Sequence, residues 1–88
     1  MYLHIGSSMT VRDSAIVGIF DLENTTISKY TRAFLKQAED NGEVVAVAED
    51  LPRAFVLTEE FGMERVYLTQ LSAAAIERRS HEAMGLGP

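Results

Sequence analysis

Apolar and polar side chains alternate at the start of the chain. Residues 2–5 (YLHI) place Leu3 and Ile5 on one side and the two polar rings on the other, and the sequence GSS follows. A period of two is typical of a strand, and a Gly-Ser cluster is typical of a turn. The pattern predicts a strand over residues 2–5 and a second short strand over residues 9–11.

In residues 15–20 (AIVGIF), every position is apolar or glycine. A short run of this kind is typical of a strand that is covered on both faces. We expect a helix on one face and a partner subunit on the other, with Ile16 and Ile19 at the subunit interface. Gly18, in the middle of the run, predicts a bulge or a close approach of backbone.

An amphipathic helix is predicted after this strand. Side chains of residues 24–26 (NTT) can accept hydrogen bonds from free N–H groups, so the helix is expected to begin there. Asn41-Gly42 predicts its left-handed stop. At 100° per residue, the helix has one apolar and one cationic face. The apolar stripe is Ile27, Thr31, Phe34, Leu35 and Ala38, flanked by Tyr30, and the opposite face carries Lys29, Arg32 and Lys36.

The second half of the chain predicts three more strands and a helix. A strand over residues 43–48 is followed by a polar turn, and residues 53–58 and 65–70 form a hairpin around EEFGM. We expect Phe55 to pair with Tyr67. This register places four side chains on the core side: Ala54, Val56, Val66 and Leu68. It leaves four on the outer face: Arg53, Phe55, Arg65 and Tyr67.

Ser72 can cap a short closing helix over residues 73–81, and residues 84–88 are expected to form a loose tail. The apolar rhythm is continuous and there is no internal repeat, so we predict a single domain over residues 1–83. The expected fold class is α+β, with a small, mostly antiparallel sheet, one main amphipathic helix and a short C-terminal helix.

Composition adds an expectation about assembly. Hydrophobic residues make up 47% of 88 residues, more than so short a chain easily buries, so we expect a homo-oligomer. Cysteine is absent, which excludes disulfides and thiol catalysis. The start of the chain does not resemble a signal peptide, and no segment approaches the roughly 20 apolar residues that span a bilayer. A cytoplasmic protein without membrane contact is expected.

The charge pattern confines any anion-binding site to part of the surface. The net charge is −5, and residues 39–50 hold five acids and no base. Affinity for phosphates comes from cationic contacts, so the surface as a whole does not favour polyanions. Any such site must therefore be local.

No catalytic or metal-binding pattern is present in the sequence. His4 and His81 lie far apart, and Asp21 and Glu23 are typical of a solvated turn beside a helix N-terminus. Neither phosphate-binding glycine motif nor the nucleophile elbow of hydrolases occurs. We therefore predict a protein that is not an enzyme and that uses no cofactor or metal.

Recognition surfaces remain as the candidate sites. The candidate nucleic-acid-binding residues are Lys29, Arg32 and Lys36 on the helix, and Arg53 and Arg65 on the hairpin. Each group has a second interpretation. The three helix cations are also typical of a solvated face, and arginine beside Phe55 and Tyr67 is also typical of a subunit interface.

The order of the segments MYLHIG, IVGIFDLENT, FLKQAEDNG, PRAFVLTEE and VYLTQLSAAAIERRS resembles the Rem family of bacterial proteins that regulate extracellular-matrix and biofilm genes, in particular its RemB-like branch. The likeness covers nearly the whole chain, from residue 1 to about residue 80. It implies a small α+β subunit that closes into a ring.

In the RemA-like branch, the resemblance implies DNA binding through arginines of the ring. Arg53 matches one family arginine, whereas Ala15, Asp50 and Leu51 occupy positions where RemA-type sequences carry arginine. Two functions are therefore open. The first is a regulator of extracellular-matrix gene expression that associates with DNA. The second is a protein-interaction ring that does not itself bind DNA, with another regulatory protein as its partner.

Overall fold

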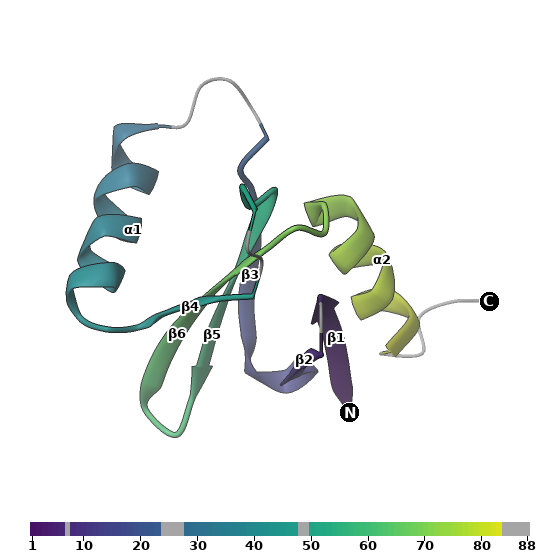
Figure 1. Ribbon diagram of the computed structural model, residues 1–88. Coiled ribbons are helices and arrows are strands. Elements are labelled where there is room, and N and C mark those ends of the chain that lie inside the picture. Colours follow the sequence, from purple (N-terminus) through teal and green to yellow (C-terminus); the bar gives the residue numbers. More distant parts are fainter. Residues whose placement is uncertain (7, 24–27, 48–49, 84–88) are drawn as a thin grey trace.

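The computed structural model describes residues 1–6, 8–23, 28–47 and 50–83. A four-stranded sheet lies at the centre, with one helix on one face and a small β-hairpin and a second helix on the other (Figure 1). The elements in chain order are β1 (Tyr2–Gly6), β2 (Met9–Arg12), a 3₁₀ turn (Asp13–Ala15), β3 (Ile16–Asp21), α1 (Lys29–Asp40), β4 (Val44–Ala46), β5 (Ala54–Glu60), β6 (Met63–Thr69) and α2 (Ala73–Ala83).

The central sheet has the strand order β3-β5-β6-β4. Its β3–β5 and β5–β6 pairs are antiparallel, and the β4–β6 pair is parallel. Strands β1 and β2 form a separate antiparallel hairpin. The α+β class, the mostly antiparallel pairing, the main helix and the short C-terminal helix are therefore confirmed.

Two separate apolar clusters hold the layers together. The first, which we call the hairpin-side core, joins β1, β2 and α2 to the sheet and consists of Leu3, Ile5, Val11, Ala54, Val56 and Ile76. The second, the helix-side core, lies under α1 and has only three buried members, Ala38, Phe55 and Val66. Partly buried side chains surround it: Leu22, Phe34, Leu35, Val44, Leu57 and Leu68.

Strand β1 is fixed to the end of β6 by a close backbone approach. Thr69 is fully buried, and its hydroxyl donates to the carbonyl of Ile5 and accepts from the N–H of Leu71. Gly6 has a φ of 128°, and a Cβ at this position would lie 2.9 Å from Thr69 Oγ1. Both the conformation and the space therefore require glycine at position 6.

Helix α1 begins later than the sequence predicted. Ser28 is its N-cap, and its Oγ accepts a hydrogen bond from the N–H of Thr31 at 3.1 Å, so the first helical residue is Lys29. Residues 24–26, where the start was expected, and Ile27, assigned to the apolar stripe, lie outside the described residues. The predicted stop is confirmed, because Asn41 caps the helix and Gly42 has a φ of 72°.

The predicted register of the β5–β6 hairpin is wrong by one residue. Phe55 pairs with Leu68, and Tyr67 pairs with Val56. The strands are joined by Phe61-Gly62 alone, both with positive φ, instead of by a five-residue loop. Consequently the expected outer face does not exist. Phe55 points toward α1, whereas Tyr67 and Arg65 lie on the face of the sheet that carries the β1–β2 hairpin.

The other boundaries differ by a few residues. Strand β4 is limited to Val44–Ala46, and residue 48 lies outside the described part. Ser72 caps α2 as predicted, since its Oγ accepts from the N–H of Ala75 at 3.1 Å, but the helix extends two residues further, to Ala83. The tail expected over residues 84–88 also lies outside the described residues. The predicted bulge in β3 is confirmed by a register shift between Ile16 and Gly18.

Candidate binding surfaces

The three helix cations lie on the solvent side of α1. Lys29, Arg32 and Lys36 are all exposed, on the face turned away from the sheet. The Nζ of Lys29 lies 5.6 Å from the centre of the Tyr30 ring, and Lys36 Nζ lies 3.9 Å from a carboxylate oxygen of Asp40. Within the described part of the chain, no carboxylate lies within ion-pair distance of Arg32.

The hairpin arginines do not join this surface. Arg53 precedes β5, and its Nε lies 3.2 Å from the carboxylate of Glu23. Arg65 stands opposite Thr58 toward the other end of the same hairpin, which places it about 17 Å along the strand from Arg53. The five candidate nucleic-acid-binding residues therefore occupy three separate parts of the molecule.

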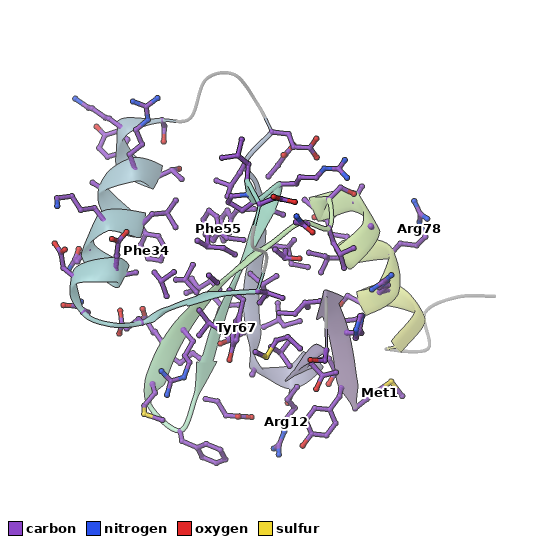
Figure 2. All side chains as sticks on the ribbon, in the orientation of Figure 1. Met1, Arg12, Phe34, Phe55, Tyr67 and Arg78 are labelled. Carbon is purple, nitrogen blue, oxygen red and sulfur yellow. The ribbon has the colours of Figure 1, made fainter. Side chains whose placement is uncertain are left out.

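All four candidate interface residues pack inside the subunit. Phe55 is 2% exposed, and its ring stacks with those of Phe20 and Phe34 at centroid distances of 4.7 and 6.1 Å. Figure 2 shows Phe34 on α1 and Phe55 on the sheet that faces this helix. Three others are partly buried against the hairpin-side core: Ile16, Ile19 and Tyr67. Phe55 is buried because α1 covers its face of the sheet, so it cannot form the surface that the sequence suggested.

The apolar side chains that β3 leaves exposed are Val17 and Phe20, at 61% and 44% exposure. Strand β3 is an edge of the central sheet, so one row of its backbone N–H and C=O groups has no neighbouring strand among the described residues. A groove of about 230 Å³ opens beside this edge. It is lined by Phe20, Tyr30, Thr31, Phe34, Phe55 and Leu57.

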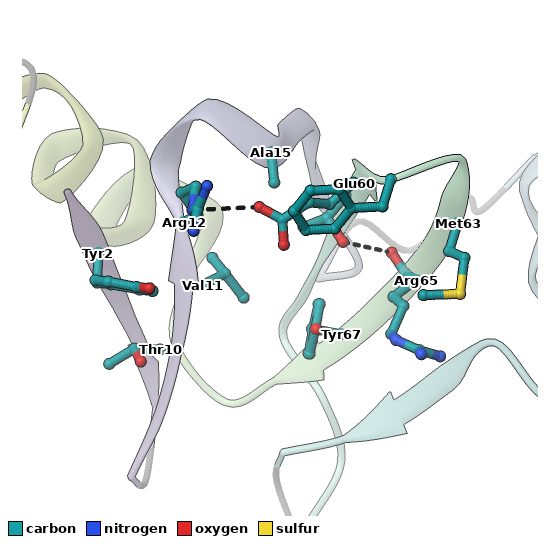
Figure 3. Close-up of a pocket in the computed structure, with 11 residues that line it drawn as sticks. Tyr2, Thr10, Val11, Arg12, Ala15, Glu60, Met63, Arg65 and Tyr67 are labelled. Atoms are coloured by element: carbon teal, nitrogen blue, oxygen red, sulfur yellow. Dashed lines mark hydrogen bonds and ion pairs between the residues drawn. The ribbon is translucent and has the colours of Figure 1, made fainter.

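A second hollow lies between the β1–β2 hairpin and the turn of the β5–β6 hairpin (Figure 3). It encloses about 190 Å³ and is bordered by two arginines, Arg12 and Arg65, together with Tyr2, Tyr67 and one carboxylate, Glu60. Arg12 Nε lies 3.3 Å from Glu60 Oε2. The hydrogen bond to Tyr2 and, second, the charge of Glu60 raise the pKa of the Arg12 guanidinium.

Sequence reasoning did not single out Arg12. It ends a four-residue strand and has no aromatic or basic neighbour in a recognisable pattern, and it lies 53 positions before Arg65. Only the packing of the two hairpins brings both residues to one hollow. No local signal could have identified this pair.

Three positions at which the resemblance implies arginine in RemA-type sequences are Ala15, Asp50 and Leu51, and here they make only local contacts or face solvent. Ala15 is buried in the 3₁₀ turn that leads into β3. Asp50 accepts a hydrogen bond from Gln70 Nε2 at 2.9 Å, and Leu51 is almost fully exposed.

Among the described residues, neither helix is long and apolar enough to cross a bilayer. No model of a known protein family matches the chain, and no curated protein sequence matches it either.

Proposed function

We propose that this chain is a non-enzymatic, self-associating regulatory protein of the Rem type that controls extracellular-matrix gene expression by associating with DNA. The observation that carries the DNA part of the proposal is the cationic face of α1. Lys29 and Arg32 are exposed there, and no acid in the described chain lies within ion-pair distance of either side chain.

Self-association is supported by the free edge of β3. An added strand would satisfy the open row of backbone groups, and this mode of recognition takes its specificity from neighbouring side-chain pockets. Val17 and Phe20 would be covered at the same time, beside the aromatic groove. A second copy of the chain is the partner in this proposal, and it contributes a different part of its surface to the contact, because only such a head-to-tail contact, repeated around an axis, closes a ring.

Assembly is also what makes DNA association feasible for an acidic protein. One subunit offers few phosphate contacts, and its net charge of −5 opposes the approach of DNA. A ring repeats the face of α1, so that one duplex reaches several copies and the weak contacts reinforce one another.

Gel filtration with light scattering tests the assembly. We expect a mass that is a multiple of 9.7 kDa for the native chain, and a shift toward the monomer for Val17→Asp. Leu51→Asp is the matched control, because it adds the same charge at an exposed apolar residue outside β3. A native protein that stays monomeric at micromolar concentration contradicts the proposal.

Titration of a labelled duplex at several salt concentrations tests DNA association. The logarithm of the binding constant should fall with log salt by about 0.9 per phosphate neutralised. Arg32→Gln should weaken binding and reduce this slope, whereas Arg53→Gln should change little, because Glu23 already pairs with Arg53. Absence of binding at tens of micromolar protein in low salt would exclude the DNA role.

The second candidate is a protein-interaction ring without DNA binding. It is favoured by the ion pairs Arg53–Glu23 and Lys36–Asp40, which compensate two of the five candidate cations. In this case, the native chain should capture a regulatory protein from nuclease-treated bacterial lysate, and Arg32→Gln should capture it equally well. Capture that disappears after nuclease treatment would instead indicate a DNA bridge.

A further inference from the structure

The hollow between the two hairpins, described above, has the size of a site for a small chemical group. Its volume of about 190 Å³ lies below the roughly 300 Å³ at which pockets for drug-sized ligands begin. Buried Val11 and Ala15 contribute to its lining, and the hydroxyl-bearing side chains Thr10 and Tyr67 border it. Such a lining suits a compact polar group.

The charges around the hollow favour an anion. Arg12 and Arg65 supply two positive charges, and Glu60 is the one acid on the lining. The lining therefore has a net charge of +1, in a chain whose net charge is −5. Arg65 is partly buried, and no described carboxylate lies within ion-pair distance of it. Its guanidinium is therefore free to bind an external anion at this position.

Arg12 can leave its ion pair with Glu60 and bind the same anion. Its partner Glu60 lies at the end of β5, and the Arg12 and Glu60 side chains are 47% and 39% exposed. Ion pairs of this exposure contribute little to stability, so exchanging the Glu60 carboxylate for a ligand oxygen costs little. The planar guanidinium then offers the paired N–H donors that suit phosphate oxygens.

From these observations we propose that the hollow binds a phosphate group, with Arg65 as the principal cation and Arg12 exchanging Glu60 for the ligand. A terminal phosphate of a small ester fits such a recess better than a phosphodiester, which continues on both sides. The site is separate from the α1 face, so this proposal stands or falls independently of the DNA association proposed above.

Nuclear magnetic resonance titration of the native chain with inorganic phosphate, and then with adenosine monophosphate, tests the site. We expect saturable shifts at residues around the hollow and about tenfold weaker binding in Arg65→Gln, the loss expected for one charge-assisted hydrogen bond. Glu60→Gln should bind more tightly, because the competing carboxylate is removed. Arg78→Gln is the matched control, since Arg78 is exposed on α2 and does not border the hollow.

The same titration with a short DNA duplex decides whether the bound phosphate belongs to DNA or to a small ester. If a short duplex gives the same shifts with the same dependence on Arg65, the group is a backbone phosphate of DNA. If the duplex leaves the hollow unchanged while adenosine monophosphate saturates it, the ligand is a small phosphate ester. The proposal is overturned if no ligand saturates the site, or if Arg65→Gln and Glu60→Gln both bind phosphate with the affinity of the native chain. Circular dichroism of each variant verifies folding, and Glu60→Gln still tests the site if Arg65→Gln unfolds.

Discussion

The two faces of the central sheet are covered in different ways. On one face, two elements from opposite ends of the sequence, the β1–β2 hairpin and α2, enclose six side chains that are at most 6% exposed. On the other face, α1 packs against the sheet in a cluster with only three buried residues, one of which, Ala38, belongs to α1 itself, and the surrounding side chains stay partly exposed. The groove at the β3 edge opens on this second face.

This difference suggests that one face of the sheet serves mainly stability and the other mainly interaction. A closed apolar cluster contributes most to folding, because the burial of its side chains is complete. An incompletely covered cluster beside a free sheet edge contributes less to folding and leaves apolar surface for a partner. We therefore expect substitutions on the hairpin side to lower mainly the free energy of unfolding, and substitutions on the helix side to weaken mainly self-association.

The sharpest test compares the same substitution on the two faces. Leu3→Ala on the hairpin side should lower the free energy of unfolding by about 3 kcal/mol, the middle of the range for buried leucines. Leu35→Ala on α1 should lower it by about 1 kcal/mol, because that side chain is only half-buried. Urea denaturation followed by circular dichroism measures both. Equal losses would mean that the two faces are equally well packed.

The second test addresses the attachment of β1. Gly6→Ala forces a Cβ into a left-handed backbone and against Thr69 Oγ1, and we expect a loss of about 2 kcal/mol. Hydrogen exchange should show faster opening of β1 and β2, with α1 largely unchanged. Uniform acceleration over the whole chain would show that the hairpin and the sheet unfold as one unit.

The third test addresses the helix side. A Cβ at Gly18 would lie 2.7 Å from the Phe20 ring, so Gly18→Ala should push that ring off Phe55. Loss of the stacked pair predicts about 1 kcal/mol lower stability, measured by urea denaturation, together with weaker self-association, measured by light scattering. Val17→Ala is the control for stability, because Val17 is exposed on the same strand. If assembly is unaffected in Gly18→Ala, the aromatic groove is not part of the interface.

The smallest expected effect lies at the hairpin tip, outside both cores. Phe61 has a φ of 55°, which a bulky side chain adopts at a cost, and its ring is exposed. Phe61→Asn should therefore raise the free energy of unfolding by about 0.5 kcal/mol, measured as a higher urea midpoint at constant slope. A lower midpoint would mean that the ring makes a stabilising contact that outweighs the strain.

Much of the fold could be predicted because local signals agree with the final structure. Apolar patterning identified the six strands and two helices of the described residues, and particular residues marked local features, such as Gly18 at the bulge and Gly42 at the end of α1. These features depend on the conformation of a few neighbouring residues, which the sequence encodes directly.

The hairpin register could not be predicted from such signals. Phe61-Gly62 is an unusual two-residue turn, because asparagine, aspartate or glycine is preferred where Phe61 has its positive φ. Moreover, β5 and β6 have apolar residues on both faces, so alternation does not tell one register from the next. An error of one residue then combined β5 side chains of one face with β6 side chains of the other. Phe55 was assigned to the surface although α1 covers it.

The candidate sites were the least predictable part. Lys29, Arg32 and Lys36 lie on one helix face as expected, because helical spacing alone determines that arrangement. Arg53 and Arg65 were expected to share a face, but they stand at opposite ends of β5 and β6. The hollow bordered by Arg12 and Arg65 depends on how two distant hairpins dock, and no spacing in the sequence records that contact.

The hairpin-side core also has a consequence for biosynthesis. Leu3 is translated 73 residues before Ile76, yet both belong to the same cluster. At roughly 5–20 residues per second, the β1–β2 hairpin waits about 4–15 s before α2 has been made. During that interval the apolar side chains of the hairpin are not yet covered by α2. A chaperone, or the same hairpin of another nascent chain, would therefore bind at β1 and β2.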